Sequence, residues 1–414
     1  MNILITNLFV DHNSGTETFV ETLADGLKRA GHNPMLYAAK LGPQAERMRE
    51  RGHVITDRIE TLSVRPDVIH AQHVSVALVA LAAFPETPVL NYCHSALFQS
   101  EAPILHPNVR RHVAVDEHCR ARCLAEGAPA ERLSVLLNPV DLEKFQLRGP
   151  LPKRPRRAVL LGKRREHRPL VEQACAAAGL ELDEVGGPER FSIALEKDLM
   201  VYDLVFAAGR SALEAAACGC SVVVCDNRGF AGLLTSANVD AWRRFNLGVG
   251  LFTRPNTAEA IGEAIAQYDP DDARAASIRI REQADLTSFV AALTALYQDC
   301  LADPPPGPPA ANTALANLLE TLLPSPAPGR WKVLAGELDA FRWNAQAGSP
   351  MTSIETVDPV AFEWAARLIH EGFSGAGSWT SCTPRERRRA RDAMRQVLTN
   401  LEKHGWAAQS AGAA

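Results

Sequence analysis

Short apolar runs alternate with segments of helical periodicity along most of this chain, and this alternation constrains the fold more than any other feature. An apolar run at 3–10 is followed by a turn at 13–15 and by a segment at 18–30 whose apolar residues recur at helical spacing. Strands that alternate with helices imply right-handed crossovers and a parallel sheet. Further strands are predicted at 35–38, 68–70, 89–92 and 113–115, and further helices at 44–51 and 74–84.

A joint rich in proline and basic residues, at 149–157, interrupts this series, and the alternation then resumes. We therefore predict two α/β domains, at 1–150 and 151–302, each with a doubly wound parallel sheet. In the second domain, strands are predicted at 158–161, 204–207 and 221–225, and helices at 170–178, 212–218, 258–268 and 287–301.

The last part of the chain has a different composition. Residues 301–330 contain eight of the 27 prolines, and five of the six tryptophans follow residue 330. We predict a semi-rigid proline-rich linker at 303–330 and a Trp-rich helical extension at 331–414 that docks on the rest of the chain or on a partner. The arginines between 385 and 395 predict a basic helix, which can be a solvated face or a surface for anionic lipid or an acidic partner.

Composition excludes several function classes. The 44 basic and 48 acidic side chains give a net charge of −4, which argues against a dedicated nucleic-acid binder. The N-terminus lacks a basic leader, and no stretch of 18 apolar residues occurs, so we expect a soluble, cytoplasmic protein, with peripheral membrane contact as an open alternative.

The nine cysteines are scattered, and Cys218, Cys220 and Cys225 lack a second pair at metal-ligand spacing. We expect core packing there and no metal site.

Polar residues follow the predicted strands of the first domain. The loop 13–17 joins a strand to a helix N-terminus, a position that favours an anion, although an ordinary turn and helix cap would look the same. The loop lacks the G-x-G-x-x-G pattern, which argues against a nicotinamide enzyme. His94 follows the strand at 89–93, at the sheet edge where parallel sheets bind ligands, and can hydrogen-bond a sugar hydroxyl. His70 and His73 follow another strand, and each of these histidines can also be purely structural.

The second domain contributes a basic loop and an acidic helix start. The loop 162–168 holds five basic-capable side chains at the end of a strand, which suits a diphosphate, with a solvated charged loop as the alternative. Gly209 permits a close backbone turn. Glu214, one turn into the next helix, can accept both hydroxyls of a ribose, or it can be a carboxylate favoured by the helix dipole.

From about residue 2 to 302 the sequence resembles the GT-B glycosyltransferases of family 4. The similar segments are the glycine loop and first helix from Gly15 to His32, the strand end Pro66–His73, and Asn138–Phe145, where Pro139 replaces the usual glycine. The resemblance implies two Rossmann-like domains facing a cleft, a nucleotide-diphosphate sugar as donor substrate, and no cofactor or metal. It also implies sugar transfer with retention of configuration.

The resemblance carries roles over to individual positions. Lys163 and Arg168 occupy the places of the two basic residues that grip the donor diphosphate in the family. Glu214 matches the second carboxylate of the family's E-x7-E element, the ribose ligand, whereas Phe206 stands at the place of the first carboxylate. His94 would position the transferred sugar.

Four neighbouring positions complete the donor site that the resemblance implies. Gly15 would supply backbone N–H groups, with Thr16 beside it, and Arg210, next to Gly209, would extend to the phosphate or the sugar. The function implied is transfer of a sugar to an unidentified acceptor. The alternatives are a catalytically weak or silent relative that binds a partner through its extension, and a nucleotide-sugar epimerase.

Overall fold

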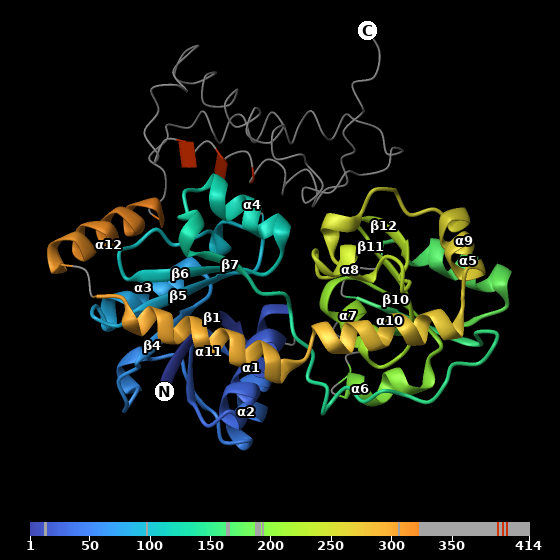
Figure 1. The fold of residues 1–414 in the computed structure, drawn as a ribbon, viewed down its shortest axis with the longest axis horizontal. Coiled ribbons are helices and arrows are strands. Elements are labelled where there is room, and N and C mark those ends of the chain that lie inside the picture. The colour runs from blue at the N-terminus through green and yellow to red at the C-terminus, as the bar shows by residue number, and fades with distance from the viewer. Residues whose placement is uncertain are drawn as a thin grey trace, which may run out of the picture. The chain divides into compact units, whose positions relative to one another are not determined.

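The computed structural model describes residues 1–11, 15–96, 98–162, 166–186, 192, 194–304, 307–322, 387–388, 391–392 and 395. The chain separates into two compact units, and both β-sheets belong to the unit formed by Met1–Ala96 and Ser100–Leu318 (Figure 1). The second unit comprises Leu97–Gln99 and Leu319–Ala414. Nearly all of the predicted Trp-rich extension lies outside the described residues.

The first sheet has seven parallel strands in the order β3-β2-β1-β4-β5-β6-β7. Its strands are β1 (Asn2–Val10), β2 (Asn33–Leu41), β3 (Val54–Thr56), β4 (Val68–Ala71), β5 (Val89–Cys93), β6 (Val109–Ala114) and β7 (Leu133–Val135). The helical segments between them are α1 (Gly15–Arg29), α2 (Pro43–Glu50), η1 (Ile59–Thr61), α3 (Val74–Ala83), η2 (Gln99–Glu101), α4 (Glu117–Ala125) and η3 (Ala130–Arg132).

The second sheet has five strands in the order β12-β11-β10-β8-β9, and its edge strand β12 runs antiparallel to β11. The predicted doubly wound architecture is confirmed, with this one antiparallel addition. The strands are β8 (Arg157–Leu161), β9 (Glu181–Val185), β10 (Leu204–Ala207), β11 (Ser221–Asp226) and β12 (Gly229–Leu233). The helical segments are α5 (Arg168–Ala178), α6 (Leu195–Asp198), η4 (Leu199–Val201), α7 (Gly209–Ala217), α8 (Val239–Arg243), η5 (Val249–Leu251), α9 (Ala258–Ala266), α10 (Pro270–Gln283), α11 (Leu286–Ala302) and α12 (Pro308–Leu322).

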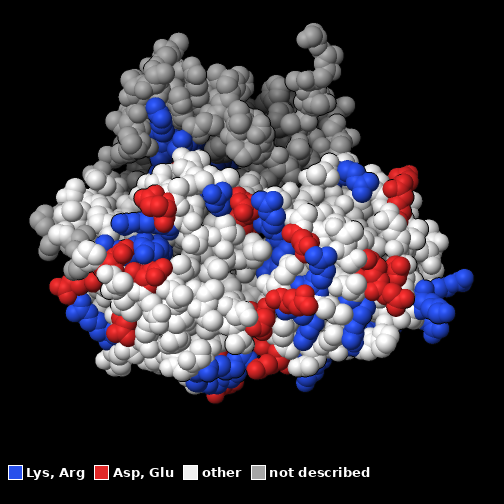
Figure 2. Space-filling view, in the orientation of Figure 1, with Lys and Arg blue, Asp and Glu red and all other residues white. Residues whose placement is uncertain are grey.

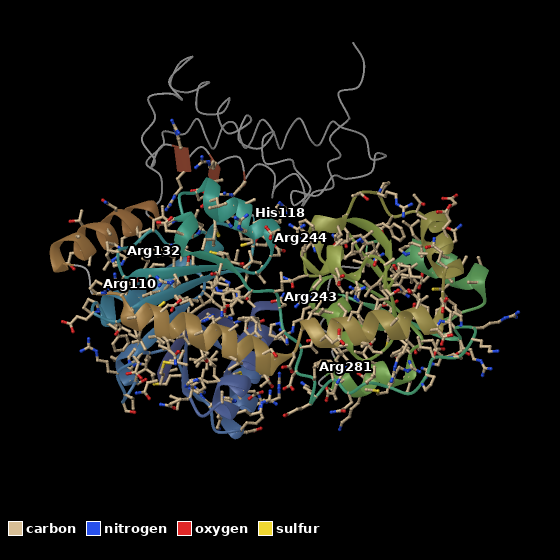
Figure 3. All side chains as sticks on the ribbon, viewed as in Figure 1. Arg110, His118, Arg132, Arg243, Arg244 and Arg281 are labelled. Carbon is tan, nitrogen blue, oxygen red and sulfur yellow. The ribbon has the colours of Figure 1, made fainter. Side chains whose placement is uncertain are left out.

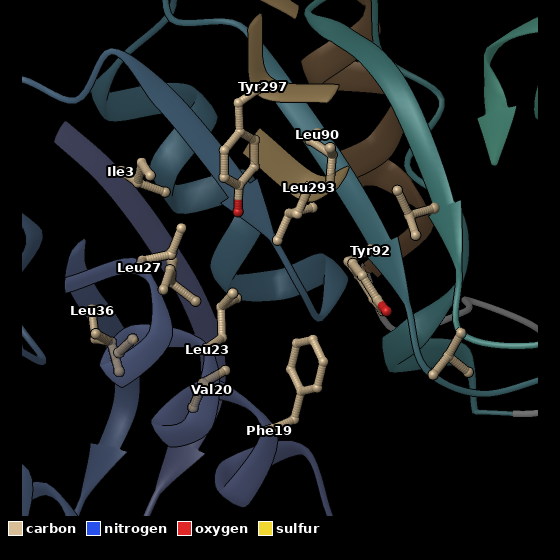
Figure 4. Close-up of a cluster of buried hydrophobic side chains, with 14 of the residues drawn as sticks. Ile3, Phe19, Val20, Leu23, Leu27, Leu36, Leu90, Tyr92, Leu293 and Tyr297 are labelled. Atoms are coloured by element: carbon tan, nitrogen blue, oxygen red, sulfur yellow. The ribbon is translucent and has the colours of Figure 1, made fainter. Parts of the chain in front are cut away.

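Apolar periodicity explains how these elements pack. Helix α1 buries Phe19, Val20, Leu23 and Leu27, which recur every three or four residues and share one face. Figure 4 shows these side chains packed in the core of the first sheet. Strands β4 and β10 are buried at every position, as expected for central strands covered by helices on both faces.

Helix α11 belongs to the core of the first sheet, although the sequence placed residues 286–302 in the second domain. Its buried Phe289 contacts Phe19 of α1. Its Leu293 and Tyr297 pack with the side chains of α1 and β5 (Figure 4). The chain passes from the first sheet to the second near Val140 and returns near Ala284. These two connecting segments are neighbours, since Val140 N–H donates to the Ala284 carbonyl at 2.7 Å. The first domain is therefore built from two separate stretches of the chain.

Part of the predicted proline-rich linker is helical. Helix α12 starts with prolines, which fit the first turn because they lack the N–H that would be unpaired there. Its Ala311 and Leu318 are buried, and Leu318 packs with the residues of β4 and α3. Residues 308–322 of the predicted linker therefore form a helix.

The surface of the described residues carries charges of both signs. Figure 2 shows acidic and basic side chains interspersed over the visible face. Within the described part of the chain, no helix combines the length and hydropathy needed to cross a membrane. The eight described cysteines are buried, and Cys218, Cys220 and Cys225 pack in the cores of the second sheet.

Candidate functional site

His94 lies where β5 ends, at the carboxyl edge of the first sheet. Its ring stacks on Tyr92 at 4.7 Å between centroids and meets the edge of Phe19 at 4.5 Å. The ring keeps some exposed surface, but its Nε2 atom is buried and has no hydrogen-bond partner among the described residues. Burial holds the pKa of this imidazole well below its usual range, and the neighbouring His73, His70 and Arg210 lower it further. His94 is therefore neutral near pH 7, with an unpaired nitrogen for a ligand.

His70 has a structural role in the same core. Its Nδ1 pairs with the hydroxyl of Tyr297 from α11 at 2.7 Å, and the side chain is fully buried. Burial lowers the pKa of His70 to about 3, so the ring stays uncharged. This contact is one of the polar links that hold α11 against the first sheet.

Gly15 and Thr16 form the first turn of α1. Gly15 is exposed, and a Cβ atom added to it would meet nothing within 4 Å, so its backbone faces open space. The start of the helix is held by Glu17, whose carboxylate accepts a hydrogen bond from Asp11 N–H at 3.0 Å. Thr16 is half-buried. The three residues before Gly15 lie outside the described part, so the rest of the predicted loop is not located.

Arg210 and Glu214 lie on the first turns of α7, the helix that follows the carboxyl end of β10. Gly209 begins the helix with a φ of +60°, a conformation that glycine adopts without strain, and its N–H donates to the Leu247 carbonyl at 2.8 Å. Arg210 Nε donates to Glu214 Oε1 at 2.7 Å. Burial raises the pKa of Glu214, whereas the charge of Arg210 and its hydrogen bond lower it. The guanidinium therefore opposes the effect of burial and favours the charged form of this carboxyl group.

A second hydrogen bond joins Arg210 to the first domain. Its Nη2 donates to Thr22 Oγ1 of α1 at 2.7 Å, while its Nη1 is buried and has no hydrogen-bond partner among the described residues. Thr22 is one turn from Phe19, which contacts His94. The structure thus brings His94, Arg210 and Glu214 together from opposite sheets. Sequence reasoning missed Thr22, and its position seven residues after Gly15, on the same helix face, was the available signal.

Phe206 has no exposed surface, in contrast to its predicted place in the donor site. Its ring packs in the apolar cluster of the second sheet with Leu160, Val223 and Phe230. The reason is the pleat of β10, which turns this side chain to the sheet face covered by α5 and α9. Phe206 has a packing role in this arrangement.

The predicted cation pair is only partly described. Arg168 begins α5, and its guanidinium forms ion pairs with Glu172 of the same helix, at 2.7 Å, and with Glu184 of β9. Lys163 lies outside the described residues. His167, the residue before Arg168, is buried, and neither of its ring nitrogens has a hydrogen-bond partner among the described residues. Burial lowers the pKa of this imidazole. The second sheet therefore also presents an unpaired buried polar group at its carboxyl edge.

Further hydrogen bonds connect the two sheets near the start of α7. Asn246 adopts a φ of +51°, donates from Nδ2 to the Val115 carbonyl at 2.6 Å, and accepts from Asn138 N–H at 2.9 Å. The buried Arg243, labelled in Figure 3, donates to the Asn138 carbonyl at 2.5 Å. Burial lowers the pKa of Arg243 to about 10.

No group of three or more His, Cys, Asp or Glu side chains in the described ranges is arranged to hold a metal ion.

Comparisons with known proteins find proteins of similar sequence and fold. Residues 13–144 match the sequence profile of Glycosyltransferase Family 4. HepE of Anabaena in complex with UDP and glucose has a similar fold at 13% identity, with a TM-score of 0.52 over 72% of this chain and 99% of that one. Its complex with UDP-glucose aligns at 14% identity and a TM-score of 0.50, over 71% and 99%.

No curated protein matches the sequence. The profile spans the part of the first domain from α1 to β7, and the similarity of structure extends over both sheets. The chain therefore has the GT-B fold of glycosyltransferases, and its residues 13–144 resemble glycosyltransferase family 4.

Proposed function

We propose that this protein transfers a sugar from a nucleotide-diphosphate sugar to an acceptor, with retention of configuration and without a metal ion. One observation carries the proposal. His94 of the first sheet and Arg210 of the second converge, and each has a buried nitrogen without a partner among the described residues. Buried polar atoms are nearly always hydrogen-bonded, so this pair favours a ligand that supplies acceptors between the two sheets.

The chemistry of the site suits the donor. The anionic diphosphate would accept hydrogen bonds from Arg210 Nη1 and from the N–H groups at Gly15 and Thr16, where the helix dipole also favours negative charge. The neutral His94 would hydrogen-bond a hydroxyl of the transferred sugar. Glu214, which accepts a hydrogen bond from Arg210, would accept the ribose hydroxyls.

Lys163 and Arg168 would stabilise the charge of the leaving diphosphate, which is the task that a metal ion performs in other transferases. Arg168 is paired with two carboxylates, so binding of the diphosphate would replace at least one of these ion pairs. The HepE complexes with UDP and UDP-glucose make uridine nucleotides the first donors to test. The extension would act separately, at an anionic membrane surface or on an acidic partner, a role that rests on sequence alone.

A second candidate, a relative that binds nucleotide without transferring sugar, is favoured by Phe206. The family has a carboxylate at this position, and here a fully buried phenyl ring replaces it. Binding of nucleotide together with the absence of turnover would distinguish this candidate from the transferase.

The test is a thermal unfolding screen of the full-length protein with UDP-, GDP-, ADP- and dTDP-sugars, followed by measurement of released nucleoside diphosphate. We expect stabilisation by one nucleotide class and loss of that stabilisation in Arg210→Met. The matched control is Arg58→Met, because Arg58 pairs with Glu60 on the surface and should not affect binding. No stabilisation by any nucleotide would contradict the proposal.

A further inference from the structure

The order in which the chain adds strands to the first sheet reverses at the border between β1 and β4. The chain proceeds from β1 to β2 and β3 on one side, and from β4 to β5 and β6 on the other (Figure 1). Open parallel sheets bind ligands at the carboxyl edge of such a point. Gln72 and His73 follow β4 at this edge, and none of the donor contacts proposed above uses them.

His73 has an unusual backbone conformation at this border. Its φ of +57° lies in the left-handed region, which a non-glycine residue adopts only at a cost of about 1–3 kcal/mol. The ring Nδ1 accepts a hydrogen bond from Leu8 N–H of β1 at 3.3 Å. Because Nδ1 accepts, the hydrogen of the neutral ring lies on Nε2. The strained backbone of His73 thus fixes the position of the Nε2–H donor.

Glu101 faces this donor without bonding to it. Its Oε1 lies 3.6 Å from His73 Nε2, which is too long for a direct hydrogen bond, and both side chains are nearly buried. The other oxygen, Oε2, is buried and has no hydrogen-bond partner among the described residues. The pair therefore offers one N–H donor and one carboxylate acceptor side by side, which matches a hydroxyl group that both accepts and donates.

Amide atoms of two side chains at the same border also lack a hydrogen-bond partner among the described residues. Gln72 is fully buried, and neither its Nε2 nor its Oε1 has a hydrogen-bond partner among the described residues. The Oδ1 atom of Asn7, on β1, is also buried and has no hydrogen-bond partner among the described residues. The backbone of Gln72 is fixed by Thr6, whose hydroxyl donates to the Gln72 carbonyl at 2.9 Å and accepts from its N–H at 3.0 Å. An unpaired buried amide costs about 1–3 kcal/mol, which indicates a ligand that pairs with it.

We propose that His73, Glu101 and Gln72 form the binding subsite for a polyhydroxylated acceptor, a saccharide or glycoside. One acceptor hydroxyl accepts from His73 Nε2–H and donates to the Glu101 carboxylate, and a second hydroxyl pairs with the Gln72 amide. The subsite deepens the proposed transferase function and rests on it. His73 follows β4 and His94 follows the neighbouring parallel strand β5, so the acceptor lies beside the sugar to be transferred.

The test measures binding of methyl glycosides of glucose, galactose, mannose and N-acetylglucosamine to the full-length protein by saturation-transfer NMR. We expect at least one glycoside to bind the wild type, and binding to weaken about tenfold to a hundredfold in Glu101→Gln, which removes the charged acceptor. Glu86→Gln is the matched control, since Glu86 forms only a surface pair with Arg65. Gln72→Met should weaken binding without lowering the thermal midpoint, because it removes the unpaired amide.

The outcomes separate this subsite from the proposed function. Stabilisation by nucleotide sugar should persist in Glu101→Gln, because Glu101 is not among the donor ligands. If no nucleotide binds while a glycoside still binds through Glu101, the transferase proposal fails and the subsite stands as a saccharide site. The subsite is overturned if no glycoside binds the wild type, or if Glu101→Gln binds as tightly as the wild type.

Discussion

Removal of the guanidinium in Arg210→Met should destabilise the protein by about 3–5 kcal/mol at pH 8. The side chains of Arg210 and Glu214 are only 11% and 5% exposed, so solvent screens their interaction little. The substitution leaves a buried carboxylate without its cation, which is among the most costly single changes in a protein core. It also removes the hydrogen bond to Thr22.

The loss should depend on pH in a defined direction. Burial already raises the pKa of Glu214 above its ordinary value of 4.5, and removal of the arginine, which opposes this shift, raises the pKa further. The penalty exists while Glu214 is charged, above its folded pKa, and fades as the pH falls and the carboxyl group takes up a proton. Arg210→Met should therefore lose less stability at pH 5 than at pH 8.

Urea unfolding of the full-length protein, followed by circular dichroism at both pH values, measures this difference. The control Arg58→Met, at a pair that is 71% and 61% exposed, should lose less than about 1 kcal/mol. The double substitution Arg210→Met with Glu214→Leu should recover most of the loss, because it removes the uncompensated charge. Equal losses at both pH values, or a double variant no more stable than Arg210→Met, would refute the reasoning.

Three further predictions concern the donor site and the core. Glu214→Ala should weaken binding of the nucleotide sugar about tenfold to a hundredfold by calorimetry, since charge-assisted hydrogen bonds to the ribose are lost; unchanged affinity would exclude Glu214 as a ribose ligand. Turnover should be unchanged by EDTA, and a loss that Mg²⁺ restores would contradict the metal-free mechanism. Because burial lowers the pKa of His70 to about 3, the unfolded chain takes up the proton first as the pH falls below 6.5. Stability should then fall by about 2 kcal/mol between pH 6.5 and pH 5, and His70→Leu should lack this component in urea unfolding.

Much of the fold follows from local patterns. The strand predicted at 204–207 is β10 to the residue, and the helix predicted at 74–84 ends one residue earlier, because these segments have strong periodicity and clear boundaries. Strands β3 and β7, with three residues each, were missed because such short segments have too little periodicity to identify. Helix α11 was predicted as a helix, but its return to the first sheet depends on contacts between residues more than 200 positions apart, such as that of Tyr297 with His70.

The candidate site likewise has features that the sequence predicts and features that only the structure shows. The sequence by itself determined two α/β series. It placed His94 at the end of a strand and Glu214 in the first turns of the helix after another strand, because the carboxyl edge of a parallel sheet follows from strand order and chain direction. Only the tertiary structure decided that Arg210 pairs with Thr22 of the other domain, that Phe206 points into the core, and that Glu101 stands opposite His73. The two contacts depend on the packing of distant segments, which leaves no periodic signal in the chain. The orientation of Phe206 depends on the pleat of β10, and because this strand is apolar and buried at every position, its sequence does not show which face each side chain takes.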